Sequence, residues 1–248
     1  MRYLVLSDIH GNLDALDAVL AALPGSRYDQ VLVLGDLVGY GPDPNGVVER
    51  IRALAPVAAI RGNHDKVAAG LEDGESFNTV ARSAVEWTVE ALSPDHRAYL
   101  AGLPAGPVLV DDVLEICHGS TFDEDAYVFD EIDALRALES ARRPVCLFGH
   151  THVALIFDRS EEAIEIAAGP GDTDGVHLTF APGHRYLINP GSVGQPRDGD
   201  PRAAAAIVDT SPGTVELCRV SYDVEEAQRK TRLAGLPEML ARRLALGR

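Results

Sequence analysis

The first sixty residues alternate between short apolar runs and helical patterns, and this alternation constrains the fold more than any other feature. Residues 3–9 (YLVLSDI) and 30–37 (QVLVLGDL) are apolar runs that carry an aspartate near their ends. Between them, residues 13–23 (LDALDAVLAAL) have the spacing of an amphipathic helix. Strand, helix and strand in this order predict a βαβ unit and therefore a parallel sheet. A helix over 44–55 and a strand over 57–61 extend the pattern.

Two further helices are predicted before the pattern changes. Apolar positions 77, 80, 85 and 92 indicate an amphipathic helix. The next helix starts at Ser93, which is suited to cap it, with Pro94 at its first position.

From residue 107 the chain reads as a series of short strands that looks antiparallel. A hairpin is predicted about Asp111 and Asp112, and residues 144–158 predict two strands joined at a pair of histidines. A loop is predicted over 169–175. Further strands are predicted at 162–168, 176–181, 185–192, 203–209 and 214–222.

The chain shows no internal repeat and no long linker, so we expect a single domain over residues 1–248. A C-terminal helix over about 236–246 is expected to pack on that domain. It places Leu236, Met239, Leu240 and Leu244 on one face, which we interpret as a packing face, with a dimer contact as the alternative. The sequence does not predict an oligomeric state.

Charge and cysteine content limit the classes of partner. The formal net charge of −16 disfavours polymeric nucleic acid as a partner, because proteins that bind it usually carry a basic face. A small phosphorylated substrate is still allowed at a local cluster of cations. Neither a membrane-spanning run nor a signal peptide is evident. Three widely spaced cysteines fit a reducing compartment, so the cytoplasm is the expected location.

Polar side chains follow the ends of five predicted strands or turns. Because the carboxyl ends of parallel strands share one edge of a sheet, these side chains are expected to converge there. Each alone could be a turn former, a helix cap or a histidine bonded to the backbone, but the joint pattern favours a metal site. The polar residues at these ends are Asp8, His10, Asp36, Asn63, His64, His118, His150 and His152, and seven of them are interpreted as ligands.

Seven ligands are too many for one tetrahedral ion and suit two ions that share a carboxylate. Imidazole, carboxylate and amide donors suit divalent Mn, Fe, Zn, Ni or Co. Three other histidines, His96, His177 and His184, fall in predicted helix or loop and are interpreted as surface residues.

The motifs DIH, GDLVG, RGNHD, CHGS and GHTH, in this order and spacing, resemble those of the calcineurin-like metallophosphoesterases over residues 1 to about 210. The stretches GDLVGYGPDP and INPGSVGQPRDGDPR further resemble a prokaryotic phosphodiesterase-like branch near the diadenosine tetraphosphate hydrolases. The resemblance implies an α/β fold, a four-layer α/β/β/α sandwich with mixed sheets. The serine/threonine protein phosphatases carry Asp-Arg-Gly after the bridging aspartate, whereas this chain has GYGPDP, which argues against that assignment.

The resemblance also implies roles for individual residues. Asp36 would bridge two metal ions, and His64 would lie near the scissile phosphate without binding metal. The first ion would be held by Asp8, His10 and His152, and the second by Asn63, His118 and His150.

The expected activity is that of a metal-dependent phosphoric ester hydrolase acting on a small phosphodiester or nucleotide, with Mn as the activating ion. A hydroxide held between the two ions would attack phosphorus in line, and protonated His64 would assist the leaving group. Arg61 and Arg197 are candidate phosphate contacts, with surface ion pairs as the alternative.

Two other functions stay open. Hydrolysis of dinucleoside polyphosphates would need a base pocket, for which Tyr40, Phe122 and Tyr127 are candidates, although they could equally be core residues. A non-catalytic scaffold on the same fold would lack part of the ligand set or the residue equivalent to His64, whereas every position is filled here.

Overall fold

The computed structural model describes residues 1–171 and 175–248. Within these residues the strands form two six-stranded sheets, and each sheet mixes parallel and antiparallel neighbours. The first sheet has the order β3-β2-β1-β11-β12-β9, with β1 (Arg2–Leu6), β2 (Gln30–Val33), β3 (Ala58–Ala59), β9 (His177–Thr179), β11 (Ala203–Asp209) and β12 (Thr214–Val220). The second has the order β4-β5-β6-β10-β7-β8, with β4 (Val108–Leu109), β5 (Leu114–Ile116), β6 (Val145–Leu147), β7 (Leu155–Arg159), β8 (Ile164–Ala168) and β10 (Arg185–Asn189).

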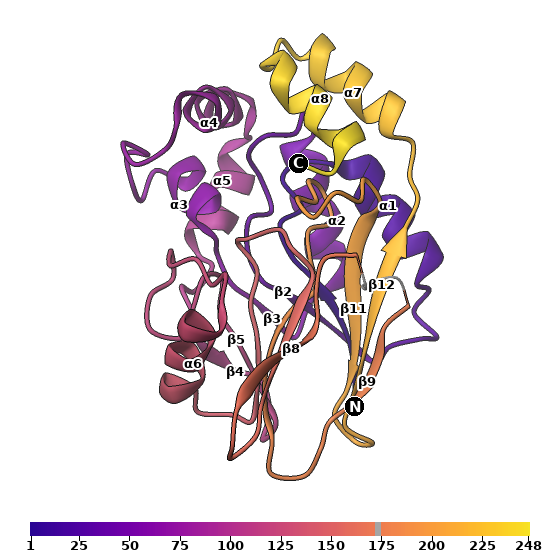
Figure 1. Ribbon diagram of the computed structural model, residues 1–248. Coiled ribbons are helices and arrows are strands. Elements are labelled where there is room, and N and C mark those ends of the chain that lie inside the picture. The colour runs from indigo at the N-terminus through magenta and orange to yellow at the C-terminus, as the bar shows by residue number, and fades with distance from the viewer. Residues whose placement is uncertain (172–174) are drawn as a thin grey trace.

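Helices cover the outer faces of both sheets (Figure 1). The helices on the side of the first sheet are α1 (Leu13–Ala22), α2 (Pro44–Leu54), α3 (Asn63–Ala69), α4 (Thr79–Ala91), α5 (Pro94–Ala101), α7 (Val224–Leu233) and α8 (Glu238–Leu246). The second sheet is covered by α6 (Glu131–Ser140).

Three apolar clusters hold these layers together. One lies between the sheets and includes Val5 of β1 and Leu147 of β6, both fully buried. Another joins α1 and α2 to the outer face of the first sheet, and a third joins α6 to the outer face of the second. The protein therefore has the expected four-layer α/β/β/α architecture with mixed sheets.

Local sequence explains where the predicted helices begin. Asn12 caps α1 by accepting a hydrogen bond from the backbone of Ala15, and Ser93 caps α5 with Pro94 at the first position, as expected. In α1, Leu16 and Val19 are buried against the first sheet, as the apolar spacing predicts.

Several expectations were wrong in detail. The strand over 57–61 is only the two-residue β3, and β10 pairs parallel with β6 within the half expected to be antiparallel. Met239 is 52% exposed, whereas the other apolar residues of the C-terminal stripe are buried. The predicted loop 169–175 includes residues 172–174, which lie outside the described residues.

His96 was also interpreted wrongly, because it is buried rather than on the surface. Its Nδ1 lies 2.7 Å from Oδ1 of Asn45 in α2, so the imidazole joins α5 to α2. His177 is exposed, as interpreted, and belongs to β9, within the strand predicted over 176–181. His184 is half-buried beside Asp158, with 2.7 Å between Nδ1 and Oδ1.

Over 1–171 and 175–248, no helix is both long enough and apolar enough to cross a membrane.

Candidate metal centre

The seven predicted ligands lie together at one end of the two sheets. Asp8 and His10 follow β1, and Asp36 follows β2. Asn63 is the first residue of α3, which follows β3. The last three come from the second sheet, with His118 after β5 and both His150 and His152 after β6. Both sheets thus contribute to one site, as the shared edge of parallel strands predicts.

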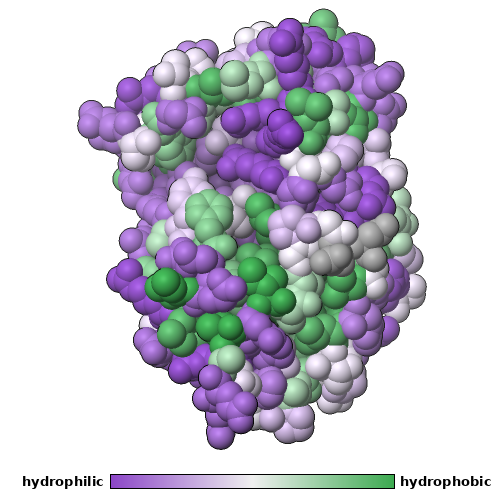
Figure 2. Space-filling view, in the orientation of Figure 1, coloured by the Kyte–Doolittle hydropathy of each residue, from purple (hydrophilic) through white to green (hydrophobic). Residues whose placement is uncertain are grey.

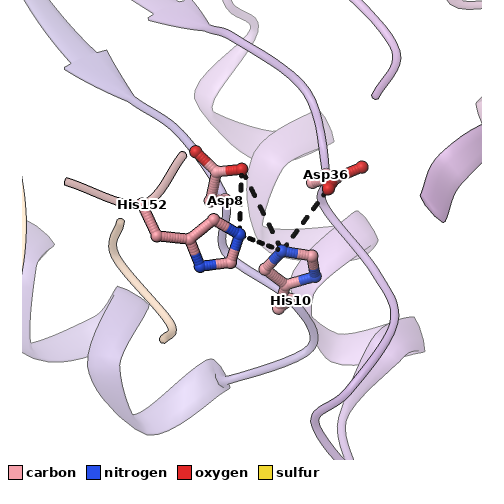
Figure 3. Close-up of side chains that lie close together, drawn as sticks. All are labelled: Asp8, His10, Asp36 and His152. Carbon is pink, nitrogen blue, oxygen red and sulfur yellow. Dashed lines mark hydrogen bonds and ion pairs between the residues drawn. The ribbon is translucent and has the colours of Figure 1, made fainter. Parts of the chain in front are cut away.

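Four of these residues form the first ligand group (Figure 3). Nε2 of His10 lies 3.4 Å from Oδ2 of Asp36, and Nε2 of His152 lies 3.4 Å from Oδ1 of Asp8. The two imidazoles face each other with 3.1 Å between their Nε2 atoms. One potential ligand atom from each residue lies within 4.8 Å of the others, which is close enough to surround one ion.

The second ligand group shares Asp36 with the first. Its other members are His118 and His150, again with ligand atoms within 4.8 Å of one another. Nε2 of His118 lies 3.5 Å from Oδ2 of Asp36, the same oxygen that faces His10. Asn63 joins this group through Oδ1, which lies 3.3 Å from Nε2 of His118. One carboxylate oxygen therefore faces an imidazole of each group.

Backbone carbonyls orient three of the imidazoles. The Nδ1–O distances are 3.0 Å from His10 to Val38, 2.8 Å from His118 to Leu34 and 2.7 Å from His152 to Gln195. An Nδ1 that donates its hydrogen to a carbonyl leaves Nε2 of the neutral ring with a lone pair. Two such lone pairs repel each other at 3.1 Å unless a cation lies between them.

The unsatisfied atoms of the site also fit divalent ions. Nε2 of His150 is buried without a hydrogen-bond partner among the described residues. Burial lowers the pKa of His150 to about 3 and the pKa values of His10 and His152 well below the usual range, so these rings are neutral at neutral pH. Neutral imidazoles with free lone pairs are the form that binds metal.

The carboxylates respond differently to the same burial. Burial raises the pKa of Asp8 to about 6. Burial also acts to raise the pKa of Asp36, but the neighbouring imidazoles, His118 first, lower it well below its usual value. Although burial opposes it, the charge of Asp36 raises the pKa of His118 to about 10, so a metal ion would have to displace that proton.

The backbone around the site is strained. Of the seven described non-glycine residues with positive φ, six belong to this region: Asp8, His10, Asp36, Tyr40, His150 and His152. Left-handed conformations of such residues cost of order 1–3 kcal/mol each and gather at functional sites. Gly62 shows how tightly the backbone approaches the ligands, since a Cβ there would lie 2.1 Å from Oδ1 of Asp36.

Comparison with known proteins decides the family. The sequence pattern described as the calcineurin-like phosphoesterase superfamily domain matches residues 1–213. The chain belongs to this superfamily. It is accordingly a phosphoric ester hydrolase by family, as the sequence motifs predicted.

Three relatives illustrate the range of similarity within the superfamily. A crystal structure of a metallophosphoesterase from Sphaerobacter thermophilus shares 41% identity at a TM-score of 0.86 and covers 100% of this chain and 99% of its own. An uncharacterized protein of Methanocaldococcus jannaschii is 34% identical over 98% of this chain and 97% of its own length. The phosphodiesterase YfcE of Escherichia coli is 25% identical over 81% of this chain and 84% of its own.

Three buried polar residues that the sequence did not single out support the superfamily motifs. Asp65 accepts hydrogen bonds from the backbone amides of Leu37, Val38 and Gly62, at 3.1–3.2 Å, and so ties the loop of Asp36 to α3. Asn189 donates to the carbonyl of Gly149 and the hydroxyl of Thr151. Ser192 donates to the carbonyl of Asp8 at 2.7 Å. Only the spacing of Asp65 three residues after Gly62, as in a capping box, offered a local signal.

His64 lies beside the ligand groups without belonging to either. Its ring packs against those of His10, Tyr40 and Phe77, with centroid distances of 4.4–4.9 Å. Its backbone N–H donates to Oδ1 of Asp36 at 2.9 Å. Burial lowers the pKa of His64 to about 4, so the ring is neutral at neutral pH and the expected protonated form does not fit the resting site.

The two candidate arginines have different surroundings. Arg61 is paired with Glu124, with 3.2 Å between Nη2 and Oε1. Arg197 donates its backbone N–H to the carbonyl of His152, and its guanidinium carbon lies 5.7 Å from the ring centroid of Tyr40. Among the described residues Arg197 forms no ion pair, and its buried Nε has no hydrogen-bond partner.

The three candidate aromatic residues also have different surroundings. Tyr40 is buried against His10 and His64. Tyr127 is 47% exposed and stacks on His150. Phe122 instead packs into the cluster beneath α6 with the guanidinium of Arg136 over its ring, so it is not part of the site.

Proposed function

We propose that this protein is a dinuclear phosphodiesterase that hydrolyses a small phosphodiester or nucleotide. The observation that carries the proposal is the position of Asp36, whose Oδ2 faces both His10 and His118 at 3.4 and 3.5 Å. A shared carboxylate of this kind suits two ions a few ångströms apart, the arrangement that phosphoryl-transfer enzymes use. The first ion would be held with Asp8, His10 and His152, and the second with Asn63, His118 and His150.

The donor set suits Mn, Fe, Zn, Ni or Co, and we propose Mn as the ion that supports activity. When bound, two such ions would supply positive charge to the substrate phosphate and lower the pKa of a water so that it can act as the nucleophile. The chain itself supplies ligand geometry, because the carbonyl contacts of His10, His118 and His152 fix their ring orientations.

Two residues outside the ligand groups would act on the substrate. Arg197 would bind a phosphate oxygen, since it has no acidic partner among the described residues, whereas Arg61 is already paired with Glu124. His64 would hold the leaving oxygen through a ring N–H, as a neutral hydrogen-bond donor whose bond strengthens as negative charge develops there, without transfer of the proton.

A small substrate is proposed for two reasons. The ligand residues other than the half-buried Asn63 are almost wholly buried, so the site suits a compact phosphate ester. The net charge of −16 disfavours polymeric nucleic acid and an anionic membrane surface as partners. We also propose a cytoplasmic location, supported by three cysteines that are all free and buried.

The test is a metal titration followed by a substrate panel. Metal-free protein would be loaded with Mn²⁺, and bound metal would be counted by elemental analysis. The panel would comprise model diesters, monoesters, cyclic nucleotides and dinucleoside polyphosphates. Two ions per chain and preferential hydrolysis of diesters are expected. A single ion at saturation would refute the dinuclear site, and preferential hydrolysis of monoesters would refute the substrate class.

A further inference from the structure

A row of three aromatic rings leads from the metal centre to the protein surface. The ring of Tyr127 lies on His150 with 3.9 Å between centroids and 30° between planes. The ring of Phe129 follows on Tyr127 at 5.3 Å, and the two planes are within 6° of parallel. Tyr127 is 47% exposed and Phe129 is 62% exposed. We call His150, Tyr127 and Phe129 the aromatic stack.

Core packing does not explain the two outer rings. The connection between β5 and α6 carries three aromatic residues, and Phe122 is the one that joins the cluster under α6. Tyr127 and Phe129 belong to none of the apolar clusters formed by the described residues. On the face shown in Figure 2, hydrophobic side chains gather in the region where Figure 1 draws α6. Exposed aromatic surface that adjoins a site is typical of ligand binding.

The segment that carries these rings is anchored near its middle. Nζ of Lys66 lies 2.6 Å from Asp125 and 3.3 Å from Glu124, and Arg61 pairs with Glu124 as well. Lys66 is almost fully buried in α3, the helix that begins at Asn63. The segment of Tyr127 is therefore fixed to the same helix that supplies a metal ligand. Because the segment is already held in place, less conformational entropy is lost when a ligand binds to the rings.

We infer that the aromatic stack binds an aromatic group of the substrate, so that the substrate is a nucleotide-type phosphodiester whose base lies against Tyr127 and Phe129. This inference rests on the proposed function, because the phosphate must occupy the metal centre for the base to reach the stack. The charges support this division, since the ligand groups and Arg197 suit phosphate, whereas Tyr127 and Phe129, the outer rings of the stack, carry no charge and offer π surface. Stacking of a base on an aromatic side chain changes binding by about 5- to 150-fold.

The test compares two diesters with the same leaving group. Thymidine 5′-(4-nitrophenyl) phosphate carries a base, whereas methyl 4-nitrophenyl phosphate does not, and both release nitrophenolate. The ratio of their kcat/KM values, measured on Mn²⁺-loaded full-length protein, isolates recognition of the base from the chemistry. Phe129→Ala is expected to lower this ratio by about 5- to 150-fold, mainly through KM, and Phe129→Tyr is expected to restore it. Ile132→Ala is the matched control, because Ile132 is 79% exposed nearby on α6 but lies outside the stack.

Each other outcome refutes the inference in a recognisable way. If wild-type protein hydrolyses both esters and Phe129→Ala leaves the ratio unchanged, the stack does not bind the base, while the proposed function stands. If Ile132→Ala lowers the ratio as much, the effect belongs to the general surface rather than to the stack. Hydrolysis of neither ester by wild type would refute the proposed function and the inference together. Light scattering that shows a dimer lost only in Phe129→Ala, with the ratio unchanged, would assign the rings to an interface between two copies of the chain.

Discussion

Replacing Arg197 by alanine tests which cation of the site binds phosphate. The guanidinium lies beside Tyr40, and Nη2 donates to Oε1 of Gln195 at 3.2 Å. No carboxylate among the described residues pairs with it, so its charge is available to a substrate. Arg61 has the same charge, but Glu124 already balances it at 3.2–3.3 Å. The two arginines were equal candidates in the sequence, and the structure makes them unequal.

The expected magnitudes follow from these contacts. A hydrogen bond to a charged group contributes about 1.5–3 kcal/mol, so Arg197→Ala is expected to lower kcat/KM by about 10- to 150-fold. Arg61→Ala removes a partly exposed ion pair, which contributes about 0–1 kcal/mol, so its effect on kcat/KM is expected to stay below about fivefold. Arg197→Lys keeps the charge without the planar fork and should fall between Arg197→Ala and wild type.

The assay is hydrolysis of methyl 4-nitrophenyl phosphate by Mn²⁺-loaded protein, with bound metal counted for each variant. Equal metal content excludes loss of metal as the cause of a lower rate. If Arg61→Ala lowers kcat/KM as much as Arg197→Ala does, the ion pair with Glu124 does not prevent Arg61 from binding the substrate. An Arg197→Ala variant with wild-type kcat/KM would refute the assignment outright.

Three further predictions concern other parts of the same region. His64→Asn is expected to keep both ions but to lower kcat by about 10²–10³-fold, the usual cost of losing one donor to a developing oxyanion, and by less for nitrophenyl than for alkyl leaving groups. An equal loss for all leaving groups would mean that His64 only positions other groups. Asp36→Asn is expected to reduce bound metal from two ions toward one in elemental analysis, and retention of both ions would contradict a bridging role. Lys66→Met should lower the free energy of unfolding in urea by about 2–3 kcal/mol, because three carboxylates lose a buried cation but are themselves partly exposed. Lys230→Met, whose ion pair is partly exposed, should cost less than about 1 kcal/mol, and equal losses for the two lysines would contradict this account.

Local patterns predicted most elements, but not how distant strands pair. The helix over 13–23 and the strands about it were predictable because apolar spacing records which face is buried. The position of β11 next to β1 was not, since the pairing of Leu4 with Ile207 joins residues about two hundred apart and leaves no local signal. The helices α3, α6 and α7 were missed as well. Of these, α3 has seven residues and begins within Gly62-Asn63, a pair that sequence alone reads as a turn.

The same distinction between local and distant information applies to the candidate site. Its ligand-type residues could be identified because each follows a strand whose apolar run is evident. The ion pairing, protonation and burial of each group could not be predicted, because they depend on partners from distant segments. Arg61 is neutralised by Glu124, sixty-three residues later. His64 is neutral because it is buried, and His96 is buried beside α2, where its Nδ1 faces Oδ1 of Asn45.

The arrangement of the ligands is a property of the fold rather than of the ions it would hold. Backbone hydrogen bonds continue beyond the strands, from Asp8 to Gly35 at 3.1 Å and from His10 to the carbonyl of Asp36 at 2.9 Å. The loops of the second sheet are joined likewise, through the amide of Gly149 and the carbonyl of His118 at 2.8 Å. These bonds, with those of the buried polar residues, hold six residues in left-handed conformations that an isolated loop would leave. Because these bonds already hold the loops, the proposed metal ions would not have to order them on binding.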